Sequence, residues 1–183
     1  AEKVVSEIEQ NLPLINIRVV TLLNTDCAYP LSRAPISLQI EGRFSEYKYI
    51  RIIWKYSFGL VNAILQYKMF LVENNISTSI SILEFSNIVN VIACKLARIP
   101  SVISVHSNPT NMVGWSKFYH YARKLGIILG NLYSEKIIVV SNEIKHVLVE
   151  RYHINPEKIC VIYNPIPVLS IEKLSLASAD NSF

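Results

Sequence analysis

Residues 135–167 read EKIIVVSNEIKHVLVERYHINPEKICVIYNPIP, and this stretch decides the fold. Its run over 137–140 is short, apolar and β-branched, which is typical of a buried strand. A helical spacing of apolar residues follows over 142–152, and Ser141 stands directly before it as a helix cap. A second β-branched run covers 158–162. Together these patterns predict a βαβ unit and therefore a parallel sheet.

The rest of the chain alternates between strand patterns and helix patterns. We expect strands over 15–22, 36–40, 77–83 and 101–105, and helices over 1–12, 47–72, 87–98 and 114–133, with a loop over 23–35. This alternation predicts an α/β fold with a mostly parallel sheet. We expect one domain over 1–167, followed by a polar linker or tail over 168–183. A doubly wound domain usually begins with a strand and a glycine-rich turn, so we also expect such a segment before Ala1 in the natural protein.

Composition and charge limit the possible functions. Half of the 183 residues are hydrophobic, but no run of eighteen uninterrupted apolar residues predicts a membrane span. The three cysteines, Cys27, Cys94 and Cys160, lie far apart, so we expect buried thiols, and no Cys/His spacing suits a structural zinc. The net charge is +4, and no Asp or Glu occurs over 86–133 or 47–72. We therefore expect an electropositive region for phosphate groups or an anionic membrane surface, although a solvated basic face fits equally well.

The predicted helix over 47–72 has an unusually wide apolar arc. Lys48, Arg51 and Lys55 share one narrow polar stripe with Asn62 and Gln66, and the other positions are mostly apolar or aromatic. Either a second element packs on this arc, or the arc contacts a membrane or a protein partner. The candidate membrane contacts are Lys48, Arg51, Trp54, Lys55 and Tyr56.

The predicted helix over 114–133 is also amphipathic. Its core face is expected to carry Trp115, Phe118, Ala122, Leu125 and Leu129, and the opposite face to carry Lys117, His120 and Lys124. Basic and aromatic residues together can bind nucleic acid, but no recognisable nucleic-acid motif is present. We therefore expect no nucleic-acid partner.

Polar residues follow four of the predicted strands. The carboxyl ends of parallel strands meet at one edge of a sheet, where ligands bind. Glu84 is the only acid near this edge in sequence, and His106 is the best candidate for proton transfer or hydrogen-bond donation. Each residue also has a structural interpretation: a satisfied histidine for His106, a carboxylate at a helix N-terminus for Glu84, a cap for Ser141 and a turn for Asn164-Pro165.

Several common catalytic motifs are absent from the sequence. It contains no nucleophile elbow, P-loop, dinucleotide-binding fingerprint or HExxH sequence. A hydrolase triad cannot be assembled from the polar strand ends.

Two segments carry a resemblance to a known family. KLARIPSVISVHSNP at 95–109, and the stretch at 135–166, resemble the N-terminal domain of retaining GT-B glycosyltransferases of family 4. The resemblance extends from Ala1 to about residue 168, and Arg98 stands where that family usually has glycine. The first strand, the glycine turn and the C-terminal domain that binds the nucleotide-sugar have no counterpart here. The chain therefore resembles an acceptor-binding half with a Rossmann-like three-layer fold, and we expect it to be inactive alone.

The resemblance implies roles for individual residues. His106 matches the strand-end histidine that contacts the donor sugar, so it is the catalytic candidate. Glu84 and Asn87 match the acceptor-side loop, and Asn108 and Lys117 are further acceptor-binding candidates. Ser141 and Asn164 match the cleft floor and the hinge between domains.

The resemblance also implies partners and a location. It implies sugar transfer with retention, without a metal or other cofactor, from a UDP-sugar to a sugar on undecaprenyl diphosphate. The sugar is expected to be an N-acetylhexosamine such as N-acetylgalactosamine, in O-antigen-type surface polysaccharide synthesis. The protein would then be cytoplasmic and peripheral on the inner face of a bacterial inner membrane.

Two other interpretations remain open. The chain could be a non-enzymatic α/β module that docks on a membrane or partner through the helix over 47–72. It could also be another nucleotide-using α/β enzyme with an unrecognised site.

Overall fold

The computed structural model describes residues 6, 16–21, 35–37, 48–110 and 117–164, without the side chains of 48–58 and 117–119. The predictions of a helix over 1–12, a loop over 23–35 and a tail over 168–183 therefore fall almost entirely outside the described residues. The same is true of Cys27 and of the side chains of all five candidate membrane contacts.

The described strands form two parallel sheets. The larger sheet has the order β3-β4-β5-β6, with β3 at Ser79–Ile82, β4 at Ser101–Val105, β5 at Lys136–Val139 and β6 at Ile159–Val161. The smaller sheet pairs β1, Val20–Thr21, with β2, Ile36–Ser37. The predicted α/β fold with a parallel sheet is confirmed.

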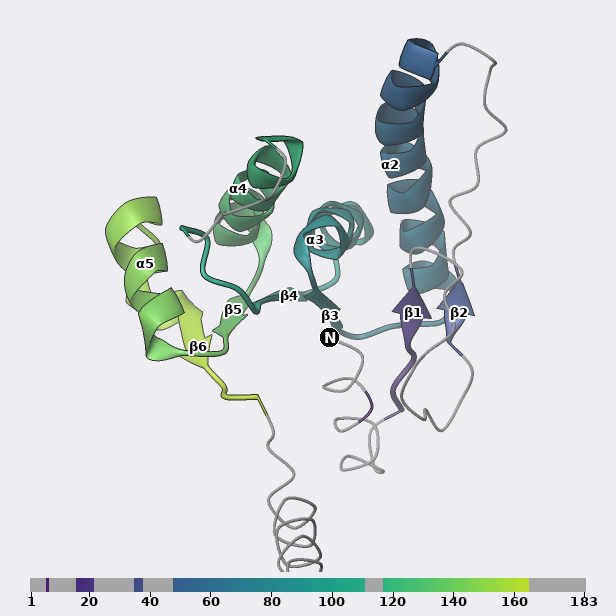
Figure 1. The fold of residues 1–183 in the computed structure, drawn as a ribbon. Helices are drawn as coiled ribbons and strands as arrows, with labels where there is room; N and C mark the ends of the chain where they lie inside the picture. The colour runs from purple at the N-terminus through teal and green to yellow at the C-terminus, as the bar shows by residue number, and fades with distance from the viewer. Residues whose placement is uncertain (1–5, 7–15, 22–34, 38–47, 111–116, 165–183) are drawn as a thin grey trace, which may run out of the picture.

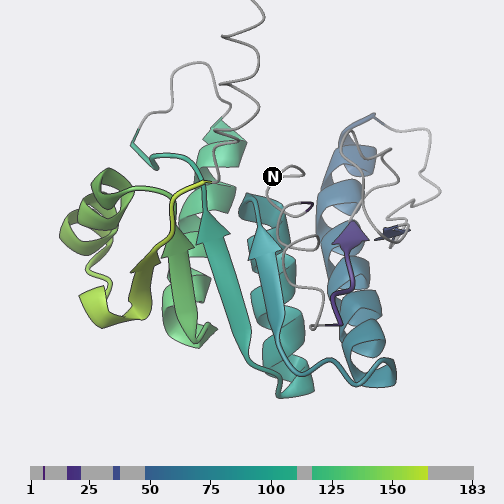
Figure 2. The ribbon, with the colours of Figure 1, turned by 90° about the horizontal axis from the view of Figure 1, so that it is seen from below.

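The helices of the larger sheet cover one of its faces. They are α3 at Glu84–Ala97, α4 at Lys117–Tyr133 and α5 at Asn142–Tyr152, with a 3₁₀ turn at Pro156–Lys158, whereas α2 at Lys48–Glu73 precedes β3 and packs against α3. Strands β3 to β6 lie in chain order, and right-handed crossovers between such strands place their helices on the same side. Figure 1 shows α3 between α2 and α4 on that face, and Figure 2 shows the sheet from its other side.

The βαβ unit predicted from residues 135–167 is β5-α5-β6. Helix α5 begins and ends at the expected residues, because Ser141 caps it: its hydroxyl oxygen accepts from the amide of Ile144 at 3.2 Å. His153 ends the helix in a left-handed conformation, with φ 51°. The helix cap and the two apolar runs were therefore sufficient to predict this unit from the sequence.

Helix α3 begins earlier than predicted. It begins at Glu84 rather than Asn87, because the chain turns sharply at Leu83, which has φ 80° and ψ 155°. Glu84 and Asn87 therefore lie in the first turn of α3 and not in a loop after β3. At the other end Arg98 adopts a left-handed conformation with φ 58°, which explains why glycine suits this position.

Two apolar clusters stabilise the domain. One lies around β4, β5 and β6 and is made of Val91, Ile103, Val105, Ile127, Ile137, Val139, Ile144, Leu148, Ile154 and Ile159. The other joins α2 to α3 and contains Ala63, Ile64, Leu71, Val89, Ala93 and Cys94. Of the cysteines that the structure describes, Cys94 is buried and Cys160 is half-buried, and both are free thiols.

The predicted core face of α4 is wrong at one of its members. Leu125 is 46% exposed, whereas Arg123 and Ile127 are buried. The helix is rotated so that Gly126 and Gly130 face the interior: a Cβ at Gly126 would lie 3.3 Å from the carbonyl oxygen of Glu84, and one at Gly130 would overlap Ile103. Because Arg123 lies on the same face of α4 as these two glycines, it is buried as well.

Candidate active site

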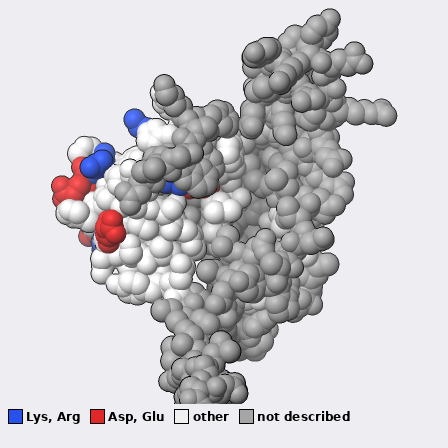
Figure 3. Space-filling view, in the orientation of Figure 1, with Lys and Arg blue, Asp and Glu red and all other residues white. Residues whose placement is uncertain are grey.

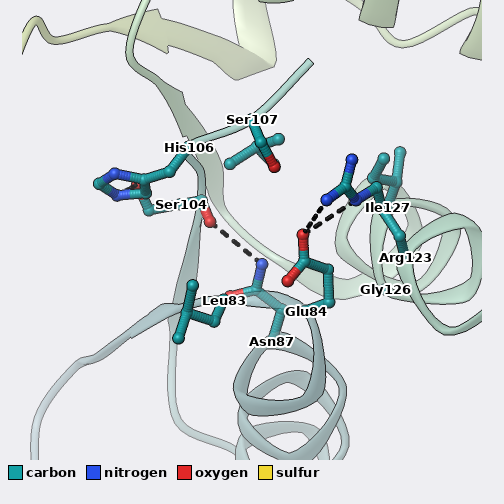
Figure 4. Close-up of a pocket in the computed structure, with 10 residues that line it drawn as sticks. Leu83, Glu84, Asn87, Ser104, His106, Ser107, Arg123, Gly126 and Ile127 are labelled. Carbon is teal, nitrogen blue, oxygen red and sulfur yellow. Dashed lines mark hydrogen bonds and ion pairs between the residues drawn. The ribbon is translucent and has the colours of Figure 1, made fainter. Parts of the chain in front are cut away.

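A small pocket lies where β3 and β4 end. The ends of these strands, the first turn of α3 and the inner face of α4 line it (Figure 4). It brings together three of the predicted site residues, Glu84, Asn87 and His106. Its volume of about 20 Å³ is room for a water molecule or a single hydroxyl group, so a sugar would contact its rim.

An ion pair forms one wall of the pocket. Arg123 on α4 places its Nη2 2.8 Å, and its Nε 2.9 Å, from Oε1 of Glu84. The two side chains are only 5% and 12% exposed, so both charges are largely withdrawn from water. Glu84 therefore has a structural partner, in agreement with the interpretation of a carboxylate at a helix N-terminus. Its acceptor-binding role stays a prediction.

His106 follows β4 directly, as predicted, and its imidazole contacts Ser104. Nε2 of His106 lies 2.9 Å from the hydroxyl oxygen of Ser104. Burial lowers the pKa of His106 below its ordinary value of 6.5, and the nearby Glu84 carboxylate opposes this shift. The ring is therefore neutral at pH 7. In Figure 4 it lies on the other side of Ser104 from the Glu84–Arg123 pair, and among the described residues its hydrogen-bond partner is Ser104.

Asn87 is buried beneath the pocket. Its Oδ1 accepts from the Ser81 hydroxyl at 2.7 Å, and its Nδ2 donates to the Ser104 carbonyl at 3.1 Å. Both ends of the amide are thus used to join α3 to β3 and β4. Contact between Asn87 and an acceptor stays a prediction.

Asn108 ties the loop after β4 to two helices. Its Oδ1 accepts from the amide and the hydroxyl of Thr110, its Nδ2 donates to Glu143 of α5 at 2.6 Å, and its carbonyl accepts from Arg123. These contacts fix the loop that carries His106. Asn108 does not line the pocket, and its acceptor-binding role is likewise untested.

The remaining predicted site residues lie at the same sheet edge but outside the pocket. Ser141 caps α5, and Asn164 is exposed after β6, next to Tyr163, whose hydroxyl accepts from Asn142 at 3.0 Å. Lys117 begins α4, but its side chain is not described. No contact within the described residues joins these three to His106.

Sequence reasoning missed Arg123 and Ser104 as pocket residues. Arg123 lies in the segment over 86–133 that has no Asp or Glu, and this pattern does not indicate that its side chain is buried. The sequence did contain one indication that Arg123 is buried. Small residues mark the close-packed face of a helix, and Arg123 lies near Ala122, Gly126 and Gly130 on α4. Ser104 stands two residues before His106 on β4, and therefore on the same face of the strand.

The acidic, histidine and cysteine side chains of the described residues are scattered. Among the described residues, no group of three or more His, Cys, Asp or Glu side chains could hold a metal ion. The predicted independence from metals is a matter for experiment.

Comparison with protein families decides the relationship. The model of Glycosyltransferase Family 4 matches residues 16–168. The chain belongs to Glycosyltransferase Family 4. A comparison with curated proteins finds no match.

Solved structures share the fold of this family member. The structure of the Anabaena protein Alr3699/HepE, in complex with UDP and glucose, is 16% identical over 80% of this chain, with a TM-score of 0.50. A glycosyltransferase from Rickettsia africae ESF-5 is 15% identical over 99% of this chain, with a TM-score of 0.54. The chain covers 38% and 46% of these proteins, so it spans less than half of either.

Proposed function

We propose that this chain is the acceptor-side half of a glycosyltransferase. The intact protein would transfer a hexosyl or N-acetylhexosaminyl group, such as N-acetylgalactosamine, from a UDP-sugar to a polyprenyl-diphosphate-linked sugar. The transfer would retain the anomeric configuration and need no metal. The observation that carries this proposal is the position of His106, at the carboxyl end of β4 in a domain whose family match covers 16–168. The Anabaena neighbour, which binds UDP and glucose, supports the choice of donor.

The residues in and beside the pocket have different roles in this proposal. Neutral His106 would donate or accept one hydrogen bond to the donor sugar, without a charge that attracts phosphate. The Glu84–Arg123 pair and Asn108 would hold the strand ends in place. The donor nucleotide would be bound mainly by a second domain.

Transfer is tested with the full-length gene product. UDP-sugars are offered with a synthetic polyprenyl-diphosphate sugar, and UDP release and the anomeric configuration of the product are measured. We expect His106→Ala to lower kcat about 100-fold, the size of effect seen when a transition-state contact is lost. His146→Ala, at an exposed histidine of α5, is the matched control and should keep full activity. EDTA should leave the rate unchanged. Full activity in His106→Ala would refute the site assignment.

A membrane-facing role is proposed for α2. Val61, Leu65, Met69 and Val72 recur at helical spacing on its outer side and are all about half exposed or more. This arrangement favours peripheral docking on the inner face of a bacterial inner membrane, where O-antigen-type precursors are built. None of the helices in the described ranges is long and apolar enough to cross a membrane.

Charge gives less support than the sequence suggested. Figure 3 shows one side of the molecule, and its described part, which lies away from α2, is mostly uncharged and carries acidic residues as well as basic ones. The electropositive region therefore stays a prediction. The apolar stripe of α2 is also the observation that favours the second candidate function, a non-enzymatic module that docks through this helix.

Vesicle flotation tests the docking surface. Full-length protein should float with vesicles that contain anionic phosphatidylglycerol. The double variant Leu65→Ser/Met69→Ser should bind about tenfold more weakly, because it removes two exposed apolar side chains. Asn62→Ser, on the neighbouring polar stripe, is the control. Equal binding by the double variant would refute docking through α2. Docking without any sugar transfer would favour the non-enzymatic module.

A further inference from the structure

A series of hydrogen bonds, most of them buried, links α2 to His106 and passes through both the carbonyl and the hydroxyl of Ser104. It begins with Tyr67 on α2, whose hydroxyl lies 2.6 Å from that of Ser79, which in turn donates to Asn90 at 2.6 Å. Asn90 donates to Ser81 at 3.1 Å, and Ser81 donates to Asn87 at 2.7 Å. Asn87 then donates to the carbonyl of Ser104, and the hydroxyl of Ser104 contacts His106. The series therefore crosses α2, α3, β3 and β4 before it reaches the pocket.

Two backbone carbonyls determine the direction of this series. A carbonyl can only accept, so the atom of Asn87 that meets the Ser104 carbonyl, and the atom of Asn90 that meets the Val102 carbonyl, must be the NH₂ groups. Both amide oxygens consequently face the serine hydroxyls and can only accept from them.

The hydroxyl protons then have one arrangement. Ser79 uses its single proton toward Asn90, so Tyr67 must donate to Ser79. Burial raises the pKa of Tyr67 to about 12, which keeps that donor protonated. Because the orientations of both amides and of the hydroxyl protons from Tyr67 to Ser81 are assigned, the Nδ2 of Asn87 is held against the carbonyl of Ser104.

The hydroxyl of Ser104 determines which ring nitrogen of His106 carries the proton. Ser104 is buried, and within the described residues His106 Nε2 is the partner of its hydroxyl. If Nε2 carried the proton, the serine proton would have no acceptor among these residues, and a buried donor without an acceptor is unfavourable. The hydroxyl therefore donates, Nε2 accepts, and the neutral ring carries its proton on Nδ1.

We propose that Ser104, clamped through its carbonyl by Asn87, is a positioning residue that holds His106 as the Nδ1–H tautomer. Free histidine favours the other tautomer, with the proton on Nε2, so the serine reverses the intrinsic preference. Nδ1 is then an N–H donor, and in the proposed function it would bind an oxygen atom of the donor sugar. Only this last step rests on the proposed function.

The tautomer is measured by long-range ¹H–¹⁵N correlation NMR at pH 7.5, on full-length protein labelled in its histidine rings. The His106 signals are assigned by their loss in His106→Gln. We expect an unprotonated Nε2 and a protonated Nδ1 in the wild type. Ser104→Ala should shift the ring toward the Nε2–H form, and Ser104→Thr, which keeps the hydroxyl, should restore Nδ1–H. Ser101→Ala removes another buried hydroxyl of β4 and should leave the tautomer unchanged.

Two results would overturn the inference: an Nε2–H ring in the wild type, or an Nδ1–H ring that persists in Ser104→Ala. The wild-type spectrum decides the first even if the alanine variant fails to fold. In the transfer assay, Ser104→Ala should lower kcat about tenfold, with recovery in Ser104→Thr. An Nδ1–H ring in a protein that transfers no sugar would support the inference and refute the proposed function. An Nε2–H ring in an active enzyme would refute the inference alone.

Discussion

Arg123 holds Glu84 through two nitrogens on a single carboxylate oxygen, with Nη2 at 2.8 Å and Nε at 2.9 Å from Oε1. The pair joins α4 to the first turn of α3, and Arg123 extends to the Asn108 carbonyl at 3.2 Å. One arginine therefore connects the two helices beside the pocket to the loop that follows His106. A nearly buried charge of this kind is tolerated only while it is paired.

The first prediction concerns this pair. Arg123→Met leaves the Glu84 carboxylate without its partner arginine, and we expect the free energy of unfolding to fall by about 3–5 kcal/mol. Glu84→Gln should also destabilise, and the double variant should lose less than the sum of the two, because the residues are coupled. Urea unfolding measures all three. Lys124→Met, at the exposed neighbouring position, is the control and should change stability by less than about 0.5 kcal/mol. Additive losses would show that the pair is not coupled.

The second prediction concerns Gly130, which lies against Ile103 of β4. A Cβ at this position would overlap Cδ1 of Ile103, so Gly130→Ala should cost about 1–3 kcal/mol despite the better helix propensity of alanine. Ile103→Val removes that methyl group and alone should cost about 0.5–1.5 kcal/mol. The double variant Gly130→Ala/Ile103→Val should lose less stability than the sum of the losses in the two single variants. A stabilising Gly130→Ala would contradict the close packing of α4 on the sheet.

The sequence predicted the elements of this fold better than their orientation. Helix α5 was placed correctly because a cap, an apolar spacing and two β-branched runs agree locally. His106 was placed correctly because parallel strands end at one edge. The inward face of α4 was predicted wrongly at Leu125. Its large apolar residues suggested one buried face, whereas the close contacts at Gly126 and Gly130 turn a different face toward the sheet. Such contacts depend on partners far away in sequence, and so Arg123 was missed.

Hydrogen bonds between elements that lie far apart in the sequence were not predicted either. Asn87 was predicted as the first residue of a helix and, through the resemblance, as part of the acceptor-side loop, but α3 begins three positions earlier at the turn of Leu83, and Asn87 is buried. Asn90 and the serines of β3 form a network that neither a period-2 nor a period-3.6 pattern indicates. Polar residues in such patterns are normally taken for surface positions.

The third prediction concerns Leu83, at the turn between β3 and α3. Its φ of 80° and ψ of 155° fall in a region that is essentially restricted to glycine and costs about 1–3 kcal/mol for other residues. The side chain is 51% exposed, so little burial is lost on truncation. Leu83→Gly should therefore stabilise the protein by about 1 kcal/mol in thermal or urea unfolding. Leu96→Gly, at a similarly exposed leucine inside α3, should destabilise it by about 1 kcal/mol. Equal losses in both variants would show that the turn is unstrained.

The fourth prediction concerns the pH dependence of stability. Burial lowers the pKa of His106 in the folded protein, whereas the unfolded chain titrates near 6.5. Between these two values the unfolded state binds more protons, so stability is complete above pH 6.5 and falls as the pH drops toward the folded-state pKa. His106→Gln should lose this part of the acid sensitivity, as measured by urea unfolding from pH 7.5 to 4.5. Ser101→Ala, which removes a buried hydroxyl from the same strand and no titrating group, should keep the wild-type dependence. If His106→Gln and the wild type lose stability in parallel, the imidazole is not desolvated at the end of β4.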